Sequence, residues 1–198
     1  MSTLATKIVV TATRAFRARG IRGVKMDDLA RELGISKRTL YETFCDKETL
    51  LDACCQRISD LHQKFLDKTI KQTDNALEII LQDMAFCLRE TQGISIEFVH
   101  DVQSYKHVAD TMKERRKNNT QKALSILQRG VEQGLFRPEV DYALFYEFFA
   151  RQVGYFSQDP CFRELSLSDI YNNIIILALR GCCTEKGLKQ IDNFKDSL

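Results

Sequence analysis

The chain has few residues that interrupt helices, with only two prolines and nine glycines in 198 residues. Proline breaks a helix interior and glycine weakens it, so their scarcity allows long helices. Apolar residues recur with the 3.6-residue period of helices, and the two-residue alternation of strands is rare. The pattern predicts an all-α protein, with Asp74 and Asp141 as N-caps of later helices.

The chain also lacks a long apolar run. Its longest uncharged apolar stretch, residues 170–179, contains two asparagines and is too short to span a hydrocarbon core of about 30 Å. The first residues show no uninterrupted apolar core of the signal-peptide type. We therefore expect a cytoplasmic protein that makes no membrane contact.

Signatures of disulfides, metals and catalysis are missing as well. The seven cysteines are an odd number without C-x-x-C spacing, which fits reduced thiols better than a disulfide framework. The three histidines have no compelling partner at i, i+4 spacing, so we expect no metal site and no cofactor. No P-loop, G-x-S-x-G, H-E-x-x-H or dinucleotide motif is present, and we expect no enzymatic activity.

The charge is nearly balanced overall but uneven along the chain. Residues 1–57 hold eleven Lys or Arg and seven Asp or Glu, a net charge of +4, whereas the whole chain carries +2. The remaining residues therefore carry −2. A cationic N-terminal part is what binding to a phosphate backbone requires, although an ordinary solvated surface is the alternative for any single charge.

The most informative segment covers residues 26–50, MDDLARELGISKRTLYETFCDKETL. Apolar residues recur at helical spacing up to Gly34, and glycine suits the left-handed conformation at a helix C-terminus. Ser36 stands where it can cap a second helix. Leu40 and Phe44 form an i, i+4 apolar pair that faces the first helix. Two short helices joined by a glycine-containing turn predict a helix-turn-helix.

The outer face of the second helix carries side chains that suit nucleic acid better than an apolar core. A recognition helix enters the major groove with its N-terminal residues nearest the bases, where Lys37 and Arg38 can bind guanine or phosphate. Tyr41 can reach a phosphate oxygen, and Glu42 can accept from cytosine or face solvent. The expected DNA-binding residues are Lys25, Met26, Ser36, Lys37, Arg38, Thr39, Tyr41, Glu42 and Lys47.

Several motifs fall in register over residues 8–50: Ala15, Phe16 and Gly20, then LARELGIS, TLYETF and DKETL. This segment, about a quarter of the chain, resembles the DNA-binding domain of the TetR/AcrR family of bacterial transcriptional regulators. Arg38 stands where the family often has a small residue, which fits direct contact with guanine. Lys25 stands where the family often has a capping Thr or Ser, which weakens one cap.

The resemblance implies a three-helix DNA-binding domain at 1–46 and a helical effector-binding and dimerisation domain at 47–198. It also implies a homodimeric repressor that binds a palindromic operator and is released by a small-molecule effector. Two copies related by a two-fold axis would read half-sites about 34 Å apart, or at a related spacing. Two alternatives stay open: a helical ligand-binding or interaction protein that has kept the fold but not operator binding, and a regulator that responds to thiol chemistry or metals.

The last two expected helices, residues 141–158 and 169–184, are apolar on more than one face and need a second partner. The core of one subunit is one explanation, whereas the resemblance implies a dimer interface. The expected interface residues are Phe149, Phe156, Ile170, Ile174 and Leu177. After Gly187 the chain has little apolar content, and we expect a frayed tail.

Aromatic residues of the central and later helices have polar neighbours, which is the usual lining of a small-molecule site. Aromatics at helical spacing also form ordinary cores, so both interpretations stay open. The ligand, if the site exists, is expected to be largely apolar or aromatic. The expected pocket residues are Phe86, Phe98, Tyr105, Phe148, Arg151, Gln152 and Tyr155.

Overall fold

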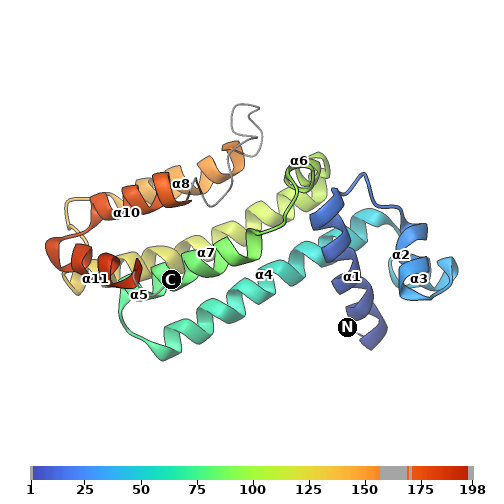
Figure 1. Cartoon of the computed structure of the whole chain (residues 1–198), viewed down its shortest axis with the longest axis horizontal. Helices are drawn as coiled ribbons and strands as arrows, with labels where there is room; N and C mark the ends of the chain where they lie inside the picture. Colours follow the sequence, from blue (N-terminus) through green and yellow to red (C-terminus); the bar gives the residue numbers. More distant parts are fainter. Residues whose placement is uncertain (1, 157–168, 170, 196–198) are drawn as a thin grey trace. The chain divides into compact units, whose positions relative to one another are not determined.

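The computed structural model describes residues 2–156, 169 and 171–195. These residues form helices and, among them, no β-strand, which confirms the all-α prediction (Figure 1). None of the described helices combines the length and the hydropathy that crossing a membrane requires. In chain order the helices are α1 (Thr3–Arg19), α2 (Met26–Leu33), α3 (Lys37–Thr43), α4 (Lys47–Gln72), α5 (Ala76–Thr91), α6 (Ile96–Ser104), α7 (Lys106–Glu132), α8 (Tyr142–Phe156), the π-helical turn η2 (Tyr171–Ile175), α10 (Ile176–Cys182) and α11 (Glu185–Lys195).

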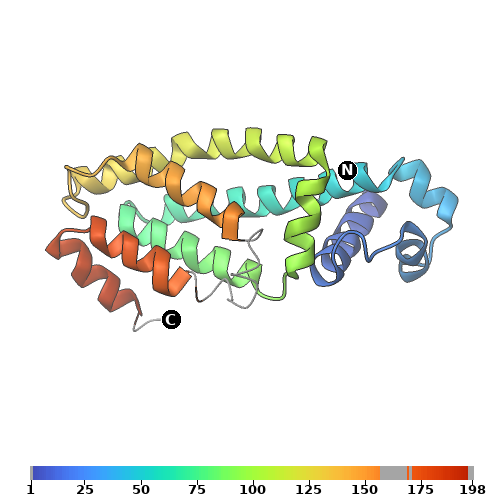
Figure 2. The same cartoon turned by 90° about the horizontal axis from the view of Figure 1, so that it is seen from above.

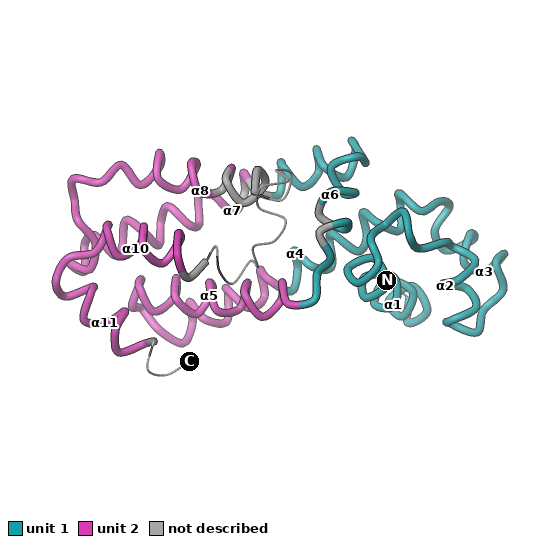
Figure 3. Tube along the Cα trace, turned by 45° about the horizontal axis from the view of Figure 1, so that its top comes forward, with its two compact units in different colours: residues 1–61, 93–115 teal, residues 62–92, 116–198 magenta. Residues whose placement is uncertain are grey.

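The chain forms two compact units, coloured separately in Figure 3. Unit 1 comprises residues 1–61 and 93–115, and unit 2 comprises residues 62–92 and 116–198. Helices α4 and α7 therefore contribute residues to both units. This division describes packing, and the functional boundary between residues 46 and 47 stays a prediction.

Unit 1 is built around the inner faces of its first three helices. Ile8 and Phe16 of α1, Leu29 of α2 and Leu40 of α3 are all fully buried in one core. Burial of each such side chain contributes roughly 1.5–3 kcal/mol relative to its exposure. Since α1 contacts α2 and α2 contacts α3, the N-terminal residues form the predicted three-helix arrangement.

Helix α6 packs against the end of α1 inside unit 1. The end of α1 is marked by Gly20, which has a φ of 71°. A Cβ on this glycine would lie 2.9 Å from the Cβ of Glu97, so both the conformation and the close approach require glycine. Just beyond it, the backbone N–H of Arg22 donates to the carboxylate of Asp101 at 2.8 Å. The sequence motifs gave no sign of this contact.

Unit 2 has its own core, which includes Leu77 of α5, Leu127 of α7 and Ile191 of α11. Helix α11 contacts α5 and α10 (Figure 2). The expectation of a frayed tail after Gly187 is therefore wrong for the described residues, because Ile191 is fully buried. A Cβ on Gly187 would clash with the carbonyl oxygen of Leu135, so glycine allows this close packing.

The two predicted N-caps of later helices have different outcomes. Asp141 accepts hydrogen bonds from the backbone N–H groups of Ala143 and Leu144 at 3.0 and 2.9 Å, which confirms its role. Asp74 was the wrong choice for α5, because Asn75 accepts from the N–H of Glu78 at 3.0 Å. The start of α5 is set from outside, since the amide of Gln133 bonds both the carbonyl of Asp74 and the N–H of Ala76.

Candidate nucleic-acid interface

The turn between α2 and α3 follows from two local signals. Gly34 takes the left-handed conformation, with φ 66° and ψ 29°, and ends α2. Two residues later, the hydroxyl of Ser36 accepts from the N–H of Thr39 at 3.0 Å and caps α3. Lys25, by contrast, makes no side-chain cap at the start of α2. The charges of Asp27 and Asp28 partly compensate for the missing cap, because negative side chains in the first turn stabilise a helix N-terminus.

Helix α3 separates a buried face from an exposed one. Leu40 is fully buried and Phe44 is 7% exposed, as their i, i+4 spacing predicts. On the opposite side the side chain of Arg38 is 87% exposed, and Tyr41 is 46% exposed as a residue. The polar residues therefore meet solvent because the apolar pair anchors the helix to α1 and α2. The face is available to a nucleic acid.

The two cations at the start of α3 are paired within the chain. The ammonium of Lys37 contacts Asp27 of α2, and the Nε of Arg38 lies 2.7 Å from an Oε1 of Glu42, one turn further along α3. Exposed pairs of this kind contribute about 0–1 kcal/mol, so DNA can displace them at little cost. Glu42 is therefore paired with Arg38 in the free protein, and its carboxylate is still accessible to DNA.

The other candidate DNA-binding residues have varied surroundings. The hydroxyls of Ser36 and Thr39 bond each other at 2.8 Å. Lys25 is exposed, whereas the side chain of Met26 is buried in the core and leaves only its backbone available. Lys47 is half-buried at the start of α4, where burial lowers its pKa and the nearby charge of Asp101 partly opposes this shift. The assignment of all nine residues to DNA binding stays a prediction.

The candidate pocket residues are distributed over both units. Phe86 of unit 2 stacks on Phe65, with ring centroids 4.3 Å apart. Phe98 is part of the unit 1 core, and Tyr105 is packed against it. In unit 2, Phe148 is exposed and Arg151 pairs with Glu147. The side chains of Gln152 and Tyr155 lie outside the described residues, and the pocket stays a prediction.

The candidate interface helices expose apolar side chains, as an interface between copies requires. Leu144 is 68% and Phe148 54% exposed on α8, while Ile174 of η2 is 37% and Leu177 of α10 66% exposed. Phe149 is half-buried against other aromatics of α8. The side chain of Phe156 and all of Ile170 lie outside the described residues. The sequence interpretation missed Leu144, although its spacing of four residues from Phe148 is a signal for a shared face.

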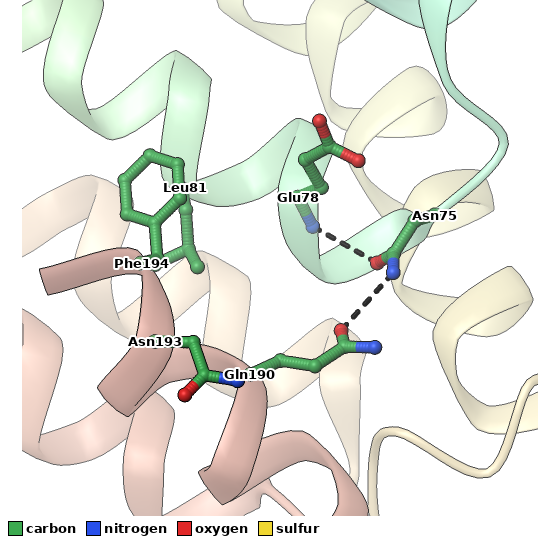
Figure 4. Close-up of a pocket in the computed structure, with 6 residues that line it drawn as sticks. All are labelled: Asn75, Glu78, Leu81, Gln190, Asn193 and Phe194. Carbon is green, nitrogen blue, oxygen red and sulfur yellow. Dashed lines mark hydrogen bonds between the residues drawn. The ribbon is translucent and has the colours of Figure 1, made fainter. Parts of the chain in front are cut away.

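A small pocket lies between α5 and α11 in unit 2 (Figure 4). It has a volume of about 260 Å³ and is lined by Asn75, Glu78, Leu81, Gln190, Asn193 and Phe194. The amide of Asn75 donates to the side chain of Gln190 at 3.1 Å across it. Ligand sites usually enclose about 300–1,000 Å³, so this pocket is slightly smaller than a typical ligand site. Sequence reasoning missed it because α11 was expected to be frayed.

One group among the described residues has the composition of a metal site. His62, Asp83 and Cys87 of unit 2 bring their ligand atoms within 4.8 Å of one another. Hydrogen bonds to Asp83 and then to Cys87 raise the pKa of His62 to about 10. His62 lies on α4 whereas Asp83 and Cys87 lie on α5, so the i, i+4 spacing of histidines in the sequence does not reveal this group.

A capped helix with an exposed polar face, packed across a glycine turn on a second short helix, defines a helix-turn-helix DNA-binding protein. Residues 8–54 match the family described as bacterial regulatory proteins, tetR family. Residues 8–54 are therefore a TetR-type DNA-binding segment, and the chain is a TetR-like DNA-binding transcriptional regulator.

Comparisons with individual proteins agree with this assignment. The chain is 29% identical over 153 residues to the HTH-type transcriptional repressor KstR2 of Mycobacterium tuberculosis (strain CDC 1551 / Oshkosh), covering 72% of this chain and 74% of that protein. The structure of the TetR family transcriptional regulator PfmR from Thermus thermophilus is 28% identical, covers 77% of this chain and 85% of that one, and has a TM-score of 0.57. A regulator from Saccharomonospora viridis in complex with choline shares the fold, at 18% identity, 93% and 100% coverage, and a TM-score of 0.76.

Proposed function

We propose that the chain is a homodimeric repressor that binds a palindromic operator through the outer face of α3. A small, largely apolar or aromatic ligand releases it from DNA. In this proposal residues 1–46 form the DNA-binding domain, to which Lys47 adds a contact, and residues 47–198 form the domain that binds the effector and dimerises. The comparisons support a DNA-binding transcriptional regulator, whereas the palindromic operator, the dimer and the ligand class are our proposals.

The observation that carries the proposal is the exposed polar face of α3. Arg38 is the residue that we assign to a base contact, because its fork of donors matches the O6 and N7 acceptors of guanine. Tyr41 and Lys47 are assigned to phosphate oxygens, where they position the protein without reading sequence. Lys37 can bind either a base or a phosphate oxygen once its ion pair with Asp27 opens. The net charge of +4 on residues 1–57 supports the same surface.

Dimerisation is supported by the apolar side chains that α8 and α10 expose. Leu144, Phe148 and Leu177 are each more than half exposed in a single chain, which is unusual for large apolar residues in one region. Pairing of these helices with their copies would bury them and create a two-fold axis. The axis would present two α3 helices to the two halves of a palindrome.

Repression and release are supported by relatives rather than by geometry. KstR2 is named a transcriptional repressor, and its structure is described as that of a ketosteroid transcriptional regulator. A ketosteroid is largely apolar, which fits the ligand class that we propose here. A ligand that binds better to a form with altered spacing of the two α3 helices lowers DNA affinity by population shift.

The test is selection of bound sequences from a random duplex pool with the purified full chain. We expect enrichment of a palindrome whose half-sites are related by two-fold symmetry. The double variant Arg38→Ala, Tyr41→Ala should lose the enrichment, since both side chains are exposed and the fold should persist. Lys64→Ala, which removes an exposed cation of unit 2, is the matched control and should select the same palindrome.

Other outcomes have defined meanings. Enrichment of a sequence without two-fold symmetry would overturn the proposal that a symmetric dimer binds a palindromic operator. No enrichment at low salt would overturn operator binding and favour a helical ligand-binding or interaction protein that has kept the fold.

A further inference from the structure

Helices α4 and α5 bring together three side chains of metal-binding type in unit 2, none of which is a candidate DNA-binding residue. The Nε2 of His62 lies 2.8 Å from the Oδ1 of Asp83, and the sulfur of Cys87 completes a group whose ligand atoms lie within 4.8 Å of one another. Imidazole nitrogen, carboxylate oxygen and thiolate sulfur are the three side-chain ligand types of zinc sites.

The helices hold these residues in position by ordinary packing. Asp83 and Cys87 stand four residues apart on α5 and therefore share one face of that helix. His62 approaches from α4, where Phe65 stacks on Phe86 of α5 with centroids 4.3 Å apart and planes 15° apart. Phe86 also stacks on the imidazole of His62 at 5.9 Å. The aromatic stack thus limits the rotation of the imidazole before any ion arrives.

The group is accessible but not fully solvated. The side chains of His62 and Asp83 are 28% and 29% exposed, and Cys87 is half-buried. An ion can reach the site from solvent, while the aromatic wall removes part of the competing water. Zinc sites that keep an open position have three protein ligands and one exchangeable ligand, which is the number available here.

We propose that His62, Asp83 and Cys87 form a binding site for a borderline-soft divalent cation, with zinc(II) as the best match. Bond lengths of about 2.0–2.3 Å place tetrahedral ligands roughly 3.3–3.8 Å apart, so the His62–Asp83 pair must open by about half an ångström. The carboxylate and the thiolate neutralise the two charges of the ion. A mixed nitrogen and sulfur donor set favours zinc over calcium or magnesium.

Zinc enters by replacing protons. The thiol of Cys87 and the Nε2 of His62 each release their proton when they become ligands. Asp83 exchanges its hydrogen bond to His62 for a bond to the ion, and water completes the coordination. The competing explanation is a hydrogen-bonded pair that only braces α4 against α5, in which Cys87 is not required.

The test uses the purified full chain without DNA, reduced and freed of metal by a chelator. Cobalt(II) is the spectroscopic probe, and zinc(II) is the competitor. We expect one cobalt per chain, thiolate-to-cobalt charge-transfer absorption in the near ultraviolet, and loss of both signals when zinc is added. Cys87→Ser should abolish the charge-transfer band. His62→Gln and Asp83→Asn should each weaken cobalt affinity by about 100-fold or more, since even outer-shell changes cost roughly 10–100-fold.

Cys45→Ser is the matched control, because Cys45 lies beside Asp46 and is the one exposed thiol among the cysteines that the structure describes. This variant should keep the full cobalt spectrum. A second measurement needs no variant: zinc should protect Cys87 from alkylation, mapped by mass spectrometry, while Cys45 remains reactive.

Absence of a thiolate band in the unmodified chain would overturn the proposal, as would a band lost in Cys45→Ser but kept in Cys87→Ser. Alkylation of Cys87 at the same rate with and without zinc would also overturn it. None of these readouts uses DNA, so a negative result here leaves operator binding to its own test.

Discussion

The backbone N–H of Arg22 donates to the buried carboxylate of Asp101 at 2.8 Å, across 79 residues of sequence. The guanidinium of Arg22 adds an ion pair to the same side chain, with Nε 3.3 Å from Oδ1. Asp101 is only 6% exposed, so few water molecules can replace these bonds. One carboxylate of α6 therefore stabilises the chain at the end of α1, just before the helix-turn-helix.

Removal of this carboxylate should destabilise unit 1. We expect Asp101→Ala to lower the free energy of unfolding by about 1–3 kcal/mol, because a part-buried N–H loses a charged acceptor. Asp101→Asn should cost less, since the amide oxygen still accepts. The measurement is denaturant unfolding followed by circular dichroism. Asp110→Ala, which removes an exposed partner of Lys113, is the control and should change stability by under about 0.5 kcal/mol.

Substitutions on α3 should separate base reading from phosphate binding. Arg38→Ala should relax base preference at one position of each half-site by about 1–3 kcal/mol. Tyr41→Phe should weaken binding similarly for all sequences, because a phosphate contact carries no sequence information. Both effects can be measured as dissociation constants for the selected operator and its single-base variants. A uniform loss with Arg38→Ala would reassign Arg38 to phosphate.

The missing cap of α2 offers a gain of stability. Lys25 already has the extended backbone of an N-cap residue, with φ −98° and ψ 145°, but its side chain makes no cap. Lys25→Ser should raise stability by about 0.5–1 kcal/mol, because its hydroxyl can accept from a free N–H of the first turn. The same change should reduce the salt dependence of DNA binding by about one ion if Lys25 contacts phosphate. Lys25→Ala, which lacks an acceptor, should show the DNA effect without the gain in thermal stability.

Charges on the apolar face of α8 and α10 should separate the proposed dimer. Leu144→Glu with Leu177→Glu should yield a folded monomer, because both side chains are exposed within one chain. Light scattering after size-exclusion chromatography measures the mass. Val10→Glu places the same charge on an exposed apolar residue of α1 and should leave the mass unchanged. A double variant that kept the dimeric mass would exclude this face as the interface.

The buried thiols of α4 should make stability fall at high pH. Burial raises the pKa of Cys54 to about 12 and that of Cys55 to about 11, from an ordinary 9.0. At a pH between the ordinary thiol pKa and these raised pKa values, the unfolded chain has lost thiol protons that the folded chain retains. The thiol contribution is therefore fully present below pH 9 and is lost as pH rises from about 9 to about 12.

Denaturation midpoints over this range test the effect in the chain and in the double variant Cys54→Ala, Cys55→Ala. The variant is less stable throughout but should lose less stability per pH unit. Cys45→Ser changes an exposed thiol and should follow the unmodified chain. Parallel curves for the double variant and the unmodified chain would contradict the assignment.

Local signals account for the success of the helix-turn-helix prediction. Gly34 ends α2 and Ser36 caps α3 through bonds that span only a few residues, so their partners are written beside them in the sequence. The i, i+4 spacing of Leu40 and Phe44 predicts the buried face for the same reason. The one misplaced cap, at Asp74, fails because Gln133 positions the start of α5 from a distant helix.

Sequence by itself thus determined the all-α class, the TetR-like helix-turn-helix and the exposed polar face of α3, because helix periodicity and capping act within a few residues. Only tertiary structure decided that α11 is ordered in its described part, that Asp101 bonds Arg22, and that His62 meets Asp83 and Cys87. Each of these depends on which helix faces pack together. That choice is made by burial of apolar side chains far apart in the chain, such as Leu77 with Ile191 and Phe65 with Phe86.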